Sequence, residues 1–165
     1  MKFKYISWLP AVIIMAVIFY FSSKPATISG ENSLTISQTL LKAYEDITDL
    51  PYGESVRQQA LLELDHIVRK TAHFIEYAIL AAAWVFHFMI RGKGNRFVAG
   101  LSILLTSFYA ASDEFHQIFV AGRSGQITDV LLDTCGAATG ALLFLSLIII
   151  IKKHWNKHTG TKMLQ

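Results

Sequence analysis

Long apolar segments constrain this chain more than any other feature of its sequence. A helix of about 20 predominantly apolar residues crosses the hydrocarbon core of a bilayer. Hydropathy places such segments at about residues 6–21, 71–90, 97–118 and 130–151. Of the 165 residues, 53% are hydrophobic and only 16% are charged, a composition too apolar for a soluble domain. We therefore expect one all-α domain over residues 1–165, a polytopic membrane protein with four transmembrane helices.

The distribution of charge predicts how these helices are oriented. Short cytoplasmic loops are enriched in Lys and Arg. Basic residues without acids flank the segments on one side, namely Lys4, Arg91, Lys93, Arg96, Lys152 and Lys153, whereas all 12 acidic residues lie toward the other side. Both termini are therefore expected in the cytoplasm, and the connections 22–70 and 112–129 outside. This orientation also explains the net charge of +3, so the charge is not interpreted as nucleic-acid binding.

The first external connection is too long for a simple turn. Apolar residues recur at helical spacing over residues 33–47 and 55–68, which predicts two short amphipathic helices with Ser33 and Ser55 as N-caps. These helices could lie on the outer leaflet or cover the mouth of the bundle. A loosely ordered loop is the alternative, because short isolated helices are marginal in water.

Three details of the apolar segments carry further expectations. The first segment is interpreted as a retained helix, because no A-x-A-type cleavage site follows it before Pro25. In the fourth, Gly136 and Gly140 have the GxxxG spacing that permits close helix approach, and packing is their expected role. The single Cys135 excludes an internal disulfide and is expected to pack in the core.

Polar and ionisable residues gather at the outer ends of three segments. They are Arg69, Lys70, His73 and Glu76 at the second segment, Asp113, Glu114, His116 and Gln117 at the third, Arg123 in the loop that follows, and Asp129 and Asp133 at the fourth. The second and fourth helices are expected to run inward and the third outward, so all three ends reach one interface. Ionisable groups at membrane depth are costly unless they are partnered or hydrated, and by default they mark a functional site. We therefore expect one external polar pocket.

Four sequence motifs carry a resemblance to a known family. F-S-S-K-P follows the first segment, K-T-A-H-F-I-E-Y opens the second, S-D-E-F-H-Q ends the third, and G-R-S-G-Q-I-T-D-V leads into the fourth. Together they resemble the VanZ-like proteins, small bacterial membrane proteins of the cell envelope, in a family named for a protein associated with teicoplanin resistance. The resemblance implicates a characteristic polar set: Lys70, His73, Glu76, Asp113, Glu114, His116, Gln117, Arg123 and Asp129.

The polar set suits recognition of an anionic headgroup. Arg69, Lys70 and Arg123 would supply hydrogen-bond donors and positive charge to a phosphate or carboxylate, with Gln117, Asp129 and Asp133 beside them. The expected partners are membrane lipids, a lipid-linked cell-wall precursor or a lipophilic glycopeptide. The structural alternative is an interhelical network of ion pairs that only fixes the register of the helices.

Catalysis on a lipid-linked substrate is the second hypothesis, as a hydrolase or transferase. His73 or His116 could act as a general base, Glu76 or Asp113 could orient it, and Glu114 is a further candidate. No motif of a known catalytic nucleophile supports this. A metal-assisted version requires His73, Glu76, Asp113 and His116 to converge on one ion, and their spacings are short enough to occur by chance. We assign no metal ligand and no cofactor, and rank ion transport lower because the inner halves of the first and fourth segments are apolar.

Overall fold

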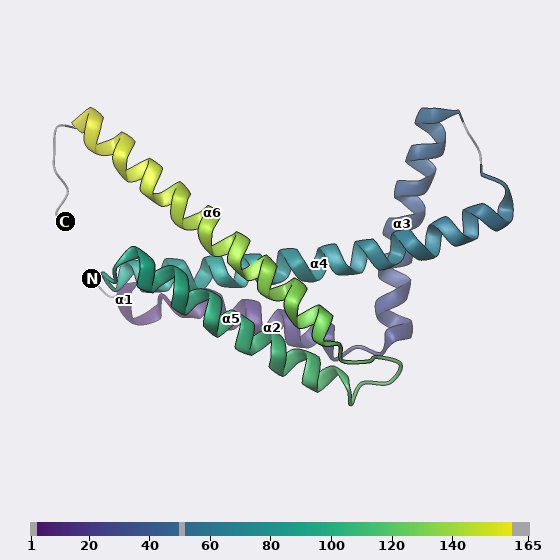
Figure 1. Cartoon of the computed structure of the whole chain (residues 1–165), viewed down its shortest axis with the longest axis horizontal. Coiled ribbons are helices and arrows are strands. Elements are labelled where there is room, and N and C mark those ends of the chain that lie inside the picture. Colours follow the sequence, from purple (N-terminus) through teal and green to yellow (C-terminus); the bar gives the residue numbers. More distant parts are fainter. Residues whose placement is uncertain (1–2, 50–51, 160–165) are drawn as a thin grey trace.

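The computed structural model describes residues 3–49 and 52–159, and every element of secondary structure in these ranges is helical (Figure 1). The helices in chain order are α1 (Phe3–Ile6), α2 (Leu9–Ser22), α3 (Ala26–Thr48), α4 (Glu54–Ile90), α5 (Asn95–Gln117) and α6 (Ile127–Thr159). The all-α prediction is therefore confirmed for the described part of the chain.

Three helical segments of the described chain are long and apolar enough to cross a membrane. They are Lys4–Ser22, Glu54–Ile90 and Ile127–His158, which contain the first, second and fourth predicted spans. Helix α5 is not among them, because it carries many polar residues. Several of these are buried against the other helices, including Ser102, Thr106 and Asp113, so the polar content of α5 faces inward.

The first connection is more helical than expected. Helix α3 begins at Ala26, with Pro25 as its N-cap, and α4 begins after Gly53, so Ser33 and Ser55 are not N-caps and that prediction is wrong. Ser33 lies inside α3, where its hydroxyl donates to the carbonyl oxygens of Ser29 and Gly30. The second predicted short helix is the first part of α4, which continues without a break into the apolar segment.

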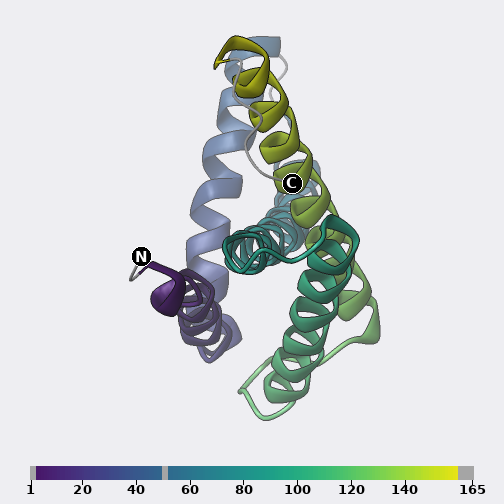
Figure 2. The ribbon, with the colours of Figure 1, turned by 90° about the vertical axis from the view of Figure 1, so that its left-hand side faces the viewer.

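Helix α4 is the centre of the packing, and α6 crosses it closely (Figure 1). A Cβ atom added to Gly136 would meet the carbonyl oxygen of Phe74, and one added to Gly140 would meet that of Ala78. The glycines therefore allow backbone contact between the two helices, as their spacing predicts. Figure 1 shows α3 and the C-terminal half of α6 leaving the bundle as two separate arms, and Figure 2 shows that both extend to the same side of it.

Two apolar clusters hold the helices together. One joins α4, α5 and α6 through Ala81, Val85, Val98, Ala137, Ala141 and Leu145, and the other joins α2, α4 and α5 through Ala11, Ile18, Tyr77, Leu80 and Ala110. Many large apolar side chains remain exposed on the outside of the helices, such as Phe108 and Leu143, each 67% exposed. Cys135 is also exposed, so the expectation that it packs in the core is wrong. It faces outward because the neighbouring Gly136 and Ala137 occupy the buried face of α6.

Candidate ligand-binding site

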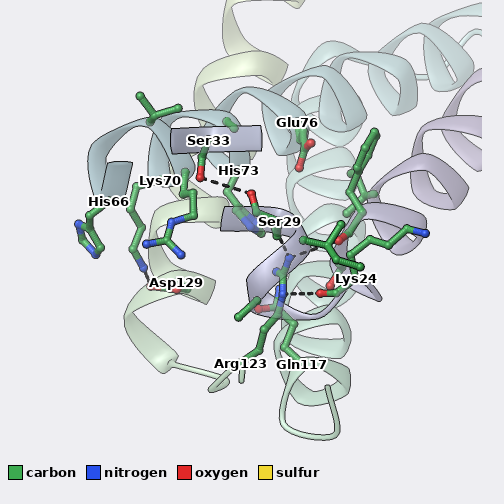
Figure 3. Close-up of a pocket in the computed structure, with 18 of the residues that line it drawn as sticks. Lys24, Ser29, Ser33, His66, Lys70, His73, Glu76, Gln117, Arg123 and Asp129 are labelled. Carbon is green, nitrogen blue, oxygen red and sulfur yellow. Dashed lines mark hydrogen bonds and ion pairs between the residues drawn. The ribbon is translucent and has the colours of Figure 1, made fainter. Parts of the chain in front are cut away.

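A cavity of about 400 Å³ lies where the end of α2, the start of α3, the middle of α4 and the loop before α6 meet (Figure 3). Seven of the sequence-predicted site residues line it: Arg69, Lys70, His73, Glu76, Gln117, Arg123 and Asp129. The structure therefore brings residues from α4, α5, the following loop and α6 to one place. Four of the predicted residues do not line this cavity: Asp113, Glu114, His116 and Asp133.

Basic residues outnumber acidic ones in the cavity wall. Lys24, Arg69, Lys70 and Arg123 line it, against Glu76 and Asp129. Lys70 forms an ion pair with Asp129. Arg69 is paired with Asp65, one turn earlier on α4, at 2.8 Å between Nη2 and Oδ2. The guanidinium of Arg69 is still partly accessible, because its side chain is 44% exposed.

The wall that α2 and α3 form mixes apolar side chains with the hydroxyl groups of Ser22, Ser29 and Ser33. Ile18 and Phe21 from α2 and Ile28 and Ile36 from α3 contribute to it. The cavity therefore combines basic side chains on α4 and the loop with apolar and hydroxyl-bearing side chains on α2 and α3. Such a surface matches a ligand that is itself both anionic and apolar.

Arg123 ties the cavity wall to the corner between α2 and α3. Its Nε donates to the carbonyl oxygen of Lys24 at 3.0 Å, and its Nη2 donates to that of Phe21 at 3.3 Å and to Ser29 Oγ at 2.8 Å. These bonds place the F-S-S-K-P motif against the G-R-S-G motif, although about 100 residues separate them in the sequence. Burial lowers the pKa of the Arg123 guanidinium, and the nearby Asp113 carboxylate opposes that shift.

Three buried acidic residues lie outside the cavity lining, and two of them, Asp113 and Glu114, accept hydrogen bonds from other segments of the chain. Asp113 Oδ2 accepts hydrogen bonds from the Tyr77 hydroxyl at 3.1 Å and from Gln117 Nε2 at 3.2 Å. Glu114 Oε2 accepts one from the backbone N–H of Gln126 at 2.9 Å. Asp133 is fully buried, with its Oδ2 at 3.9 Å from His73 Nδ1. Part of the predicted site is thus a network between helices, which is the structural alternative.

The structure separates the candidate catalytic residues into two that line the cavity, His73 and Glu76, and three that do not, Asp113, Glu114 and His116. The ring of His116 packs against Phe19, with 4.8 Å between ring centroids. Among residues 3–49 and 52–159, no group of three or more His, Cys, Asp or Glu side chains is arranged to hold a metal ion. The convergence of His73, Glu76, Asp113 and His116 on one ion is therefore not found there.

Sequence reasoning missed several polar residues of the cavity wall, among them Lys24, Ser29, Ser33 and His66. Figure 3 shows them beside the predicted residues. Lys24 belongs to the F-S-S-K-P motif, which was a usable signal. Ser29 and Ser33 are placed by the return of α3 over α4, and the sequence pattern gives no sign of that contact. The buried Tyr77 was also missed, although it ends the K-T-A-H-F-I-E-Y motif.

An all-helical chain with helices of membrane-spanning length, exposed apolar side chains and a polar cavity at one junction of its helices belongs to the class of helical membrane proteins. More specifically, this chain belongs to the VanZ/LLP1 family, whose family model matches residues 7–151. The match covers all four motifs and every residue that lines the cavity, and it confirms the resemblance. No curated protein and no solved structure matches the chain.

Proposed function

We propose that this protein crosses the bacterial cell membrane four times as a single domain, with both termini in the cytoplasm and the cavity open to the outside. Helix α5 supplies the fourth span. Its polar residues Ser102, Thr106 and Asp113 are buried against the bundle, whereas Leu104 and Phe108 are exposed. Polar groups inside and large apolar groups outside are the arrangement that lipid requires of a spanning helix.

The cavity binds an anionic, partly apolar ligand. The observation that carries this proposal is that one cavity brings the basic side chains of Arg69, Lys70 and Arg123 together with apolar side chains of α2 and α3. Guanidinium and ammonium groups recognise phosphate or carboxylate, and the apolar wall accommodates a hydrocarbon group. Anionic membrane lipids, lipid-linked cell-wall precursors and lipophilic glycopeptides all have this chemistry.

Binding is favoured over catalysis by the position of the acids. Asp113 and Glu114 accept hydrogen bonds from groups of the protein itself, and neither lines the cavity. A general base must lie within hydrogen-bond reach of the proton that it removes. Of the proposed acids and bases, only His73 and Glu76 are placed to meet a ligand there.

The test compares two arginines on α4. Arg69→Gln removes a charge from the cavity wall, whereas Arg57→Gln removes a charge paired with Glu45 at 3.2 Å, away from the cavity. Retention of phosphatidylglycerol would be measured by native mass spectrometry in mild detergent. We expect Arg69→Gln to weaken retention about tenfold, since one charge-assisted hydrogen bond is lost, and Arg57→Gln to leave it unchanged. Equal retention by all three proteins would reject the cavity as the binding site.

The cellular consequence of such binding is a change in glycopeptide susceptibility. We expect the protein, expressed in a susceptible Gram-positive host, to raise the inhibitory concentration of teicoplanin, and the Arg69→Gln variant to raise it less. The wild-type protein and the Arg69→Gln variant must reach the membrane in equal amounts for this comparison. An unchanged inhibitory concentration with the wild-type protein would separate binding from resistance.

A further inference from the structure

A second hollow adjoins the cavity on the other side of Lys70. It is a groove of about 300 Å³ between α4 and α6, lined by His66, Ile67, Lys70, Thr71, Phe74 and Leu132. His66 and Lys70 line both the groove and the cavity. The ion pair between Lys70 and Asp129 therefore lies at the border between a charged cavity and an apolar groove.

The groove is lined almost entirely by apolar atoms, and the two basic residues that it shares with the cavity stand at one end of it. His66, Lys70 and Phe74 are four residues apart, so they share one face of the helix and follow one another at steps of about 6 Å. Leu132 supplies the facing wall from α6. At Phe74 the two helices come into backbone contact through Gly136, and this contact bounds the groove toward the middle of the bundle. A basic cavity that adjoins an apolar groove has the polarity of a lipid molecule, with the headgroup in the cavity and the chain in the groove.

We propose that the α4–α6 groove holds one acyl chain of an anionic phospholipid whose headgroup occupies the cavity. This inference rests on the proposed function and narrows its ligand class to a chain-bearing membrane lipid. Thr71, Phe74 and Leu132 lie at the outer ends of the proposed spans 71–90 and 130–151, so this part of the groove faces the hydrocarbon of the bilayer. Lys70, which the groove shares with the cavity, complements the phosphate of the same molecule. A soluble anion would gain nothing from Thr71, Phe74 and Leu132.

The test fills the groove while leaving the cavity intact. Leu132→Trp places a larger side chain in the groove, and Leu131→Trp is the matched control on the adjacent position of α6, which is 61% exposed and does not line either hollow. Two probes are compared by titration in mild detergent: phosphatidylglycerol with oleoyl chains, and glycerol 3-phosphate, which lacks chains. We expect Leu132→Trp to weaken phosphatidylglycerol binding about tenfold, through loss of buried methylene contacts, and to leave glycerol 3-phosphate binding unchanged. Leu131→Trp should change neither.

Each outcome decides between the two proposals. Equal phosphatidylglycerol affinity of Leu132→Trp and Leu131→Trp would overturn the groove assignment, and the cavity would stand if Arg69→Gln still weakened both probes. A wild-type protein that binds neither probe overturns both proposals. A second measurement needs no variant: a phosphatidylglycerol with a photoreactive diazirine in its chain should label Phe74 or Leu132 in the wild-type protein. Labelling confined to outward residues such as Leu131 or Ile79 would overturn the groove assignment.

Discussion

The guanidinium of Arg123 joins segments that are far apart in the sequence, through its bonds to Phe21, Lys24 and Ser29. We expect Arg123→Ala to destabilise the protein by about 2–4 kcal/mol, because it removes a half-buried charged donor and leaves the three acceptors without their hydrogen bonds. The loss of stability is measured by thermal unfolding in detergent, with the folded fraction at each temperature determined by size-exclusion chromatography. A ligand-binding defect in this variant would therefore be ambiguous, which is why Arg69 is the better probe of the cavity.

Arg123→Lys provides the control for the charge alone. A lysine keeps the positive charge but cannot reproduce the planar set of donors that reaches several acceptors at once. We expect it to recover less than half of the lost stability. Full recovery would show that charge at the corner matters, and that the three hydrogen bonds do not.

Gly140 and Gly100 form a matched pair of helical glycines. Gly140→Ala would place a Cβ against the carbonyl oxygen of Ala78, whereas a Cβ at Gly100 meets nothing within 4 Å. We expect Gly140→Ala to cost about 1–3 kcal/mol by separating α4 from α6, and Gly100→Ala to be neutral or slightly stabilising. The same unfolding measurement compares them. Equal unfolding midpoints would mean that α4 and α6 accommodate the added methyl group without loss of stability.

At the scale of the element, α3 has an exposed apolar stripe. Ile36, Leu40, Tyr44 and Ile47 are exposed on one side of the helix, next to the face that buries Ser33, Ser37 and Leu41. An amphipathic helix of this kind lies in the membrane interface with its apolar stripe in lipid. We therefore expect α3 to rest on the outer surface of the bilayer, with Lys42 toward water.

Cysteine labelling tests this placement of α3. In a background of Cys135→Ser, which removes the only cysteine, a membrane-impermeant maleimide should react with Lys42→Cys and react at least about tenfold more slowly with Leu40→Cys. The two positions lie on the same exposed helix, so folding defects affect both alike. Equal labelling rates in proteoliposomes would place the stripe in water.

The elements could be predicted from the sequence to different degrees. Hydropathy locates the apolar parts of α2, α4 and α6, since lipid requires long runs of apolar residues. Helical spacing predicts a helix over residues 55–68, but neither signal shows that this helix continues without a break into the apolar segment. The usable signal was the absence of Gly and Pro between residues 54 and 90.

The residues of the site could also be predicted only in part. Spacing along a helix identifies the residues that share a face, and it brought Arg69, His73 and Glu76 together. It does not determine how each helix is rotated in the bundle. Asp113 and Glu114 consequently appeared equivalent to the cavity residues, although they bond to other parts of the protein.

At the scale of the whole molecule, the proposed orientation predicts which connections can be labelled from outside intact cells. In the Cys135→Ser background, we expect an impermeant maleimide to label Gln58→Cys and not Lys93→Cys, because α4 separates these exposed residues by a full span. Permeabilised cells should allow both to react, which controls for reactivity. The reverse pattern would place the cavity in the cytoplasm.

The cavity is built from the first, middle and last parts of the chain, as its lining by Ile18, Arg69 and Asp129 shows. During synthesis, the segments that supply Ile18 and Arg69 are made well before Asp129 leaves the ribosome. A chain arrested after α5 would therefore be an inserted membrane protein without a complete binding site. Ligand retention would then report that biogenesis has finished, and a lipid bound at the border of α4 and α6 would help the last helix to stay in place.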